Sequence, residues 1–174
     1  MQITPLSSAL GAEITGVDLA NLDAATGAAI KDAFHEHLVL VFPDQDVPPA
    51  AQGSFTEPHP LKTRATVDGF PHVLIIENKP GRPGAPNDYW HSDISHAKMP
   101  PAVSVLHALK IPGDGRGDTM FCNMVKAFDG LSETLRDTLT GMRALHSGQA
   151  TYKRSLGHSD ARRINPDEVK PPRA

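Results

Sequence analysis

The sequence has 174 residues, a formal net charge of −3 and 39% hydrophobic residues. A chain of this length can bury a core, and this composition excludes a disordered tail. The 17 basic residues are scattered along the sequence, and aromatic residues make up only 5%. Both features argue against nucleic acid as a partner.

The compartment is indicated by the apolar runs and by cysteine usage. The longest apolar run, Leu38–Phe42, is far too short to cross a bilayer. No basic start followed by an apolar stretch is visible near Met1, so we expect no secretory signal. The single cysteine, Cys122, excludes an internal disulfide framework and fits a reducing compartment. We therefore expect a cytoplasmic protein with no membrane partner.

The beginning of the chain predicts two short strands followed by a helix. The strands are expected at Gln2–Pro5 and Ala12–Thr15. Asn21 or Asp23 can cap a helix that runs to about His37. The apolar stripe of this helix would consist of Ile30, Phe34 and Leu38.

The middle of the chain predicts further strands. Leu38–Phe42 and Val73–Glu77 are rich in apolar and β-branched residues and favour buried strands. Ala102–Leu109 and Thr119–Phe121 have good β-propensity. A short helix is expected after Pro48 and Pro49.

A second clear helix is predicted after Ser132. Ser132 is a favourable N-cap, Glu133 suits the first turn, and Gly141 lies near the expected end. One helical face would carry Leu135, Leu139 and Met142. Short strands with helices outside them predict an α+β fold, mainly β, in a single domain over residues 1–174.

Asn87–Asp93 is the segment that points most directly to chemistry. If it is extended, His91 and Asp93 point to the same face, because side chains alternate along a strand. An imidazole and a carboxylate are two of the three ligands of the facial triad that binds non-haem Fe(II). The third ligand would be another histidine.

Several motifs accompany this segment in a fixed order. They are Gly11–Leu19, Trp90–Asp93, Pro100–Ala102, Gly117–Thr119 and Ala127–Ser132. In order and spacing, this set resembles the taurine dioxygenase-like (TauD/TfdA) family of Fe(II)/2-oxoglutarate-dependent dioxygenases. The resemblance covers most of the chain.

The resemblance implies a double-stranded β-helix (jelly-roll) core with flanking helices. It also implies that His91 and Asp93 bind iron and that the Thr119 hydroxyl binds a carboxylate of 2-oxoglutarate. Asn87 and His59 would line the substrate pocket. Taken without the resemblance, Thr119 can be a residue at a strand start, His59 a solvated loop residue and Asn87 a turn former.

The implied reaction consumes O2 and 2-oxoglutarate and hydroxylates a small substrate, with formation of succinate and CO2. The substrate is expected to be anionic: a sulfonate, a sulfate ester or a carboxylate. The cofactor is Fe(II), 2-oxoglutarate is the co-substrate, and we expect a homo-oligomer.

The sequence departs from the family pattern near its end. The family carries a distal histidine ligand and a 2-oxoglutarate-binding arginine on later strands, whereas this sequence ends at Lys170–Ala174, about where the family enters the segment before them. His158 is the only histidine after His146, and it lies in a polar stretch without a strand pattern. We therefore expect an incomplete domain. A non-catalytic binding or assembly module is the alternative, and a zinc-dependent hydrolase using His91 and Asp93 is a third hypothesis.

Overall fold

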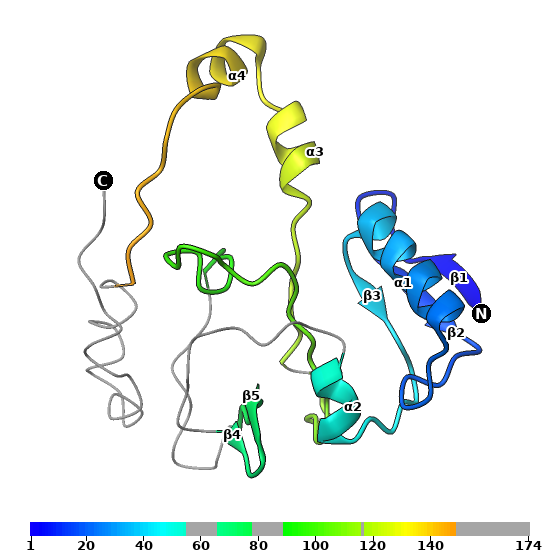
Figure 1. Cartoon of the computed structure of the whole chain (residues 1–174). Helices are drawn as coiled ribbons and strands as arrows, with labels where there is room; N and C mark the ends of the chain where they lie inside the picture. Colours follow the sequence, from blue (N-terminus) through cyan, green and yellow to red (C-terminus); the bar gives the residue numbers. More distant parts are fainter. Residues whose placement is uncertain (55–65, 78–88, 116, 149–174) are drawn as a thin grey trace. The chain divides into compact units, whose positions relative to one another are not determined.

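The computed structural model describes residues 1–54, 66–77, 89–115 and 117–148 (Figure 1). The chain divides into two units. The first consists of Met1–Pro48 with His107–Met142, and the second of Pro49–Leu106 with Arg143–Ala174. His59 and Asn87, two of the predicted site residues, lie outside the described residues. The single domain stays a prediction.

A three-stranded sheet forms the beginning of the first unit. Strand β1 (Gln2–Pro5) pairs antiparallel with β2 (Ala12–Thr15), which pairs in parallel with β3 (Leu40–Val41). The backbone N–H of Leu6 donates to the Gly11 carbonyl at 2.9 Å and closes the turn between β1 and β2. Both predicted strands at the start of the chain are confirmed.

Helix α1 (Ala24–His37) connects β2 to β3. Its N-cap is Asp23, whose carboxylate accepts a hydrogen bond from the Thr26 backbone N–H at 2.7 Å. Its C-cap is Leu38, which has a left-handed backbone (φ 67°) and donates its N–H to the Phe34 carbonyl. The predicted helix is confirmed, and of the two candidate caps it is Asp23 that caps it.

The predicted buried strand Leu38–Phe42 is correct only for Leu40–Val41. Leu38 is needed to turn the chain out of α1, so it belongs neither to the strand nor to the helical stripe. Its side chain and that of Val41 are exposed. The other two members of the predicted stripe, Ile30 and Phe34, are half-buried.

The core of the first unit is small. Ala12 and Ile14 of β2 have an exposed fraction of 0%, and Ala33 of α1 and Val47 are also buried. Burying an isoleucine side chain fully stabilises a fold by about 1.5–3 kcal/mol. Strand β2, which lies between two neighbours in the sheet, is therefore the centre of this unit.

Two short helices complete the first unit. Helix α3 (Met124–Asp129) is capped by Asn123, and α4 (Glu133–Leu139) by Ser132, whose hydroxyl accepts from the Leu135 N–H at 3.4 Å. The second of these helices was predicted and is confirmed, whereas α3 was not predicted.

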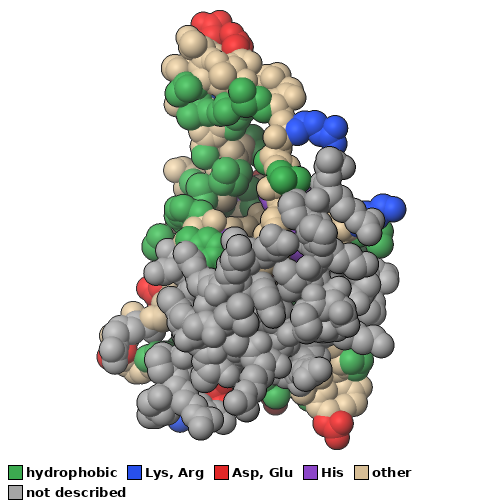
Figure 2. All heavy atoms as spheres, turned by 90° about the vertical axis from the view of Figure 1, so that its left-hand side faces the viewer, with side chains coloured by type: hydrophobic (Ala, Val, Ile, Leu, Met, Phe, Trp, Pro, Cys, Tyr) green, Lys and Arg blue, Asp and Glu red, His purple; other side chains and the backbone are tan. Residues whose placement is uncertain are grey.

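Figure 1 draws α3 and α4 at the top of the view, and Figure 2 shows hydrophobic side chains (green) at the surface of that end. The exposed apolar residues here are Met124, Val125, Phe128, Leu135, Leu139 and Met142.

The second unit contains α2 (Pro49–Ser54) and a hairpin of β4 (Thr66–Val67) with β5 (Phe70–Leu74). The helix after the two prolines is confirmed. The predicted strand Val73–Glu77 is shifted: the strand ends at Leu74, while Val73 is buried and the side chains of Ile75 and Ile76 are exposed.

Two predicted strands are wrong. Ala102–Leu109 and Thr119–Phe121 have irregular backbone in the structure. Strand propensity only creates a strand where a neighbouring strand supplies backbone hydrogen-bond partners. The described residues thus form two small sheets and no closed barrel, and their helices are too short and too polar to cross a membrane.

Candidate active site

His91 and Asp93 lie in the second unit, where the chain enters a turn. His91 has irregular backbone and Asp93 begins a turn, so the extended segment expected here is not observed. The turn over residues 93–96 contains Ile94 with a positive φ of 49° and is closed by the Ala97 N–H, which donates to the Ile94 carbonyl at 2.9 Å. The turn, rather than strand alternation, brings the two side chains together.

The imidazole and the carboxylate lie side by side. His91 Nε2 is 3.5 Å from Asp93 Oδ1, with 33% of the histidine and 54% of the aspartate side chain exposed. At such exposure the attraction between a protonated His91 and Asp93 contributes little to stability. The close approach of the two side chains therefore suits joint binding of a metal ion better than an ion pair that stabilises the fold.

The ring of His91 is oriented by the residue two positions before it. Its Nδ1 lies 2.9 Å from the Tyr89 backbone carbonyl, and the two rings are 5.3 Å apart between centroids. A carbonyl accepts hydrogen bonds and cannot donate them, so Nδ1 is the donor in this contact. In a neutral imidazole with this hydrogen bond, Nε2, the nitrogen that faces Asp93, carries the lone pair.

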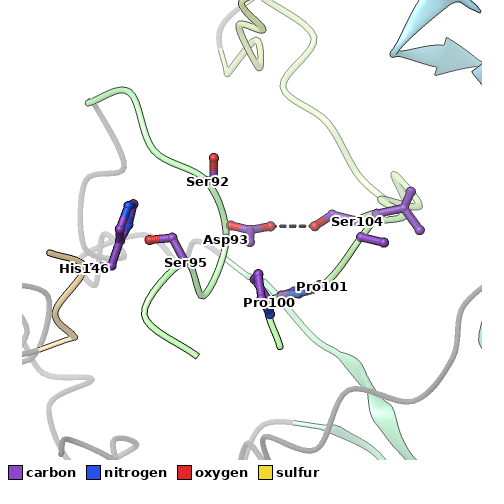
Figure 3. A pocket seen from close by; sticks show the side chains of 9 residues that line it. Ser92, Asp93, Ser95, Pro100, Pro101, Ser104 and His146 are labelled. Atoms are coloured by element: carbon purple, nitrogen blue, oxygen red, sulfur yellow. Dashed lines mark hydrogen bonds between the residues drawn. The ribbon is translucent and has the colours of Figure 1, made fainter. Parts of the chain in front are cut away.

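The carboxylate of Asp93 is held from its other side. Ser104 Oγ donates a hydrogen bond to Asp93 Oδ2 at 2.6 Å. Figure 3 shows these two side chains pointing toward each other across a pocket. The pocket has a volume of about 520 Å³, which is in the range of small-molecule sites. Its lining also includes Ser92, Ser95, Pro100, Pro101 and His146.

The other site predictions have different outcomes. Thr119 is exposed and belongs to the first unit, so its role as a 2-oxoglutarate ligand stays a prediction. His146, which sequence alone left without a role, lines the pocket from the segment after α4. Ser104 was not predicted, and no spacing pattern connects it with Asp93.

The two donor atoms fit one metal ion. Two ligands of a facial triad lie on the same side of the ion, about 3 Å apart for bonds of about 2.1 Å. The observed separation is 3.5 Å, so a small adjustment of these exposed side chains would bring both donor atoms onto one ion. Within residues 1–54, 66–77, 89–115 and 117–148 no group of three such side chains lies together. The described residues therefore supply two candidate ligands of a facial triad.

The comparison with known proteins identifies the class. The family model described as "Taurine catabolism dioxygenase TauD, TfdA family" matches residues 2–173. Relatives of this chain are named as α-ketoglutarate-dependent dioxygenases. The chain belongs to the TauD/TfdA family, and the resemblance deduced from its motifs is confirmed.

Two relatives illustrate the similarity. The α-ketoglutarate-dependent sulfate ester dioxygenase of Pseudomonas putida is 33% identical over 87% of this chain and 51% of its own length. The (S)-phenoxypropionate/α-ketoglutarate-dioxygenase of Delftia acidovorans is 31% identical over 91% of this chain and 58% of its own length. The chain thus spans about half the length of the curated relatives it matches.

A solved structure shows the same similarity in three dimensions. A taurine dioxygenase from Burkholderia xenovorans superposes with a TM-score of 0.67 at 32% identity, covering 84% of this chain and 53% of that one. The fold of this chain is therefore that of part of a taurine dioxygenase-like protein.

Proposed function

We propose that this chain belongs to an Fe(II)- and 2-oxoglutarate-dependent dioxygenase in which His91 and Asp93 are two of the iron ligands. The observation that supports this best is the 3.5 Å separation between His91 Nε2 and Asp93 Oδ1 beside a pocket of about 520 Å³. The proposal includes a jelly-roll core, in agreement with the similarity to a solved taurine dioxygenase.

The residues of this chain would bind and orient the ion. A neutral imidazole and one carboxylate compensate only one of the two positive charges of Fe(II), so an anionic keto acid can still bind. When bound, iron supplies the activation of O2 that couples decarboxylation of 2-oxoglutarate to hydroxylation of a C–H bond. The Tyr89 carbonyl keeps the His91 ring turned toward Asp93.

A small anion is the proposed substrate. The relatives are named for a sulfate ester and a phenoxypropionate, both of which are anionic. In this proposal Thr119 binds a 2-oxoglutarate carboxylate, and Asn87 and His59 contact the substrate. The products are succinate, CO2 and the hydroxylated substrate or its breakdown products.

The first test is the binding of iron and keto acid without oxygen. Fe(II) and 2-oxoglutarate added anaerobically should give the weak visible absorption of an iron-chelated keto acid, and admission of air should yield succinate. His91→Ala should lose the absorption. Loss of a residue that hydrogen-bonds to a metal ligand typically weakens metal binding by ~10- to 100-fold, and loss of a ligand itself should weaken it more.

The matched control is His72→Ala, which removes an exposed histidine of β5 and should leave the absorption intact. A parent chain that shows neither the absorption nor succinate contradicts the proposal. Equal absorption in parent and His91→Ala would place the iron elsewhere.

A non-catalytic module is the second candidate. It is favoured by the absence of a third metal-binding side chain near His91 and Asp93 among the described residues. The same assay separates the two functions, because such a module binds metal or partner without forming succinate in air.

A further inference from the structure

Ser104 lines the pocket and lies outside the family motifs found in the sequence. Its hydroxyl donates to Asp93 Oδ2 at 2.6 Å, while Asp93 Oδ1 faces His91 Nε2. We propose that Ser104 is a positioning residue that holds the Asp93 carboxylate in the orientation required for metal binding. This inference rests on the proposed function, because it assumes that Asp93 is a ligand.

The length of the hydrogen bond supports this role. Hydroxyl donors approach ionised carboxylates to about 2.5–2.7 Å, closer than neutral acceptors, and these bonds are about twice as strong. The Ser104–Asp93 distance lies in that range. The contact is therefore a charge-assisted hydrogen bond to one defined oxygen of Asp93.

Asp93 requires such a constraint because little else restricts its side chain. It is 54% exposed, and the terminal torsion of an aspartate has a broad, roughly two-fold energy profile. Without a partner, the carboxylate plane would rotate readily about this torsion. A donor on one oxygen, Oδ2, fixes the plane and with it the direction of the other oxygen, Oδ1, beside His91.

The two ligands are thus oriented in the same manner. The Tyr89 carbonyl holds Nδ1 of His91, and the Ser104 hydroxyl holds Oδ2 of Asp93. In each side chain the second donor atom, Nε2 or Oδ1, faces the other ligand. Partners of this kind raise metal affinity by fixing the orientation of a ligand before the ion binds.

A purely structural role is the alternative. Ser104 and Asp93 are separated by a turn and by Pro100 and Pro101, so their hydrogen bond could serve only to fold this loop. In that case removal of the hydroxyl would lower stability without changing metal affinity. Both side chains are exposed, so the chain should tolerate the substitution and both quantities can be measured.

The test is a titration with Co²⁺ in place of Fe(II), followed through Trp90. Trp90 is the only tryptophan of the sequence and precedes His91 directly, so its fluorescence reports binding at this site. Ser104→Ala should raise the Co²⁺ dissociation constant by about 10-fold or more. Ser104→Thr keeps the hydroxyl and should bind Co²⁺ as the parent does.

Ser95→Ala is the control, because it removes a hydroxyl from the same pocket lining and leaves the Ser104–Asp93 hydrogen bond in place. Its Co²⁺ affinity should equal that of the parent. The thermal midpoint without metal should be unchanged in Ser95→Ala, and any fall of the midpoint in Ser104→Ala should be accompanied by weaker Co²⁺ binding. A lowered midpoint with unchanged Co²⁺ affinity in Ser104→Ala would show a structural contact and overturn the inference.

The outcome also separates this inference from the proposed function. If the parent binds Co²⁺, His91→Ala weakens binding and Ser104→Ala does not, the iron site stands and the role of Ser104 is wrong. If the parent does not bind Co²⁺, both are wrong.

Discussion

Single hydrogen bonds determine what His91 and Asp93 can do. Each side chain has one atom held by the surrounding chain and one atom directed at the other, at a separation of 3.5 Å. Only a backbone carbonyl and one hydroxyl are needed to orient the two side chains in this way. If His91 and Asp93 bind iron as proposed, an exposed loop orients both ligands without burying them.

Asp23, the cap of α1, makes the stability of the protein depend on pH. The hydrogen bond from the Thr26 backbone N–H, assisted by the Thr26 side chain, lowers the pKa of Asp23 below its ordinary value of 3.8. The Asp23 carboxylate is therefore protonated less readily in the folded state than in the unfolded state. The cap stabilises the fold at pH values above the pKa that Asp23 has in the unfolded chain. This contribution is lost as the pH falls through the lowered, folded-state pKa.

We expect Asp23→Asn to make the thermal midpoint less sensitive to acid, since Asn still caps the helix but does not titrate. Circular dichroism melts from neutral pH to below pH 3.8 would measure this. Asp18, whose pKa is lowered mainly by the Asn21 side chain, should account for part of the remaining sensitivity. Asp32→Asn removes a charge from the same helix without touching the cap. An unchanged acid dependence in Asp23→Asn would contradict the prediction.

At the scale of elements, two glycines of the first unit have opposite roles. Gly11 precedes β2 with a φ of 94°, a conformation that side chains disfavour, and its added Cβ would lie 3.5 Å from the Leu6 side chain. Gly27 lies inside α1, where an added Cβ would meet no atom within 4 Å. The first glycine is required by the turn, whereas the second weakens its helix.

Alanine substitutions should therefore shift the free energy of unfolding in opposite directions. Gly11→Ala should destabilise the protein by about 1–2 kcal/mol, because a Cβ is strained in the left-handed region. Gly27→Ala should stabilise it by roughly 0.5–1 kcal/mol, because Gly loses more conformational freedom in a helix. Urea unfolding would measure both, and shifts of the same sign would be inconsistent with the φ angles observed here.

At the scale of the whole molecule, the first unit joins segments that are far apart in the sequence. The Asn123 side chain caps α3 with its oxygen, while its amide nitrogen donates to the Ala9 carbonyl at 2.8 Å. The Lys126 ammonium also donates to the Ser8 carbonyl. These contacts attach the beginning of α3 to the turn between β1 and β2.

Asn123→Asp separates the two roles of this side chain. A carboxylate still caps α3, because Asp and Asn are comparable caps, but it cannot donate to Ala9. Loss of a hydrogen bond worth about 1 kcal/mol should speed amide exchange at Leu6 and Gly11 by about 5-fold. Hydrogen exchange followed by NMR would measure this. Asn21→Asp is the control, and an equal effect of both variants would show that the Ala9 contact is not responsible.

The sequence predicted those features that depend on neighbouring residues. The caps Asp23 and Ser132 act on N–H groups three residues away, so local sequence identifies them. Strand Ala102–Leu109 was wrong because a strand requires a partner that local sequence does not specify. Ser104 was missed for a similar reason, since its contact with Asp93 depends on the path of the loop between them.

The parallel pairing of β2 with β3 bears on the order in which the first unit folds. The β1–β2 hairpin pairs residues that are close in sequence, such as Pro5 with Ala12. Ala12 meets Leu40 only across the whole of α1. Distant pairings form late because loop closure costs entropy before the new contacts compensate for it. We therefore expect hairpin and helix to form first, and the two residues of β3 to be the last to join the sheet.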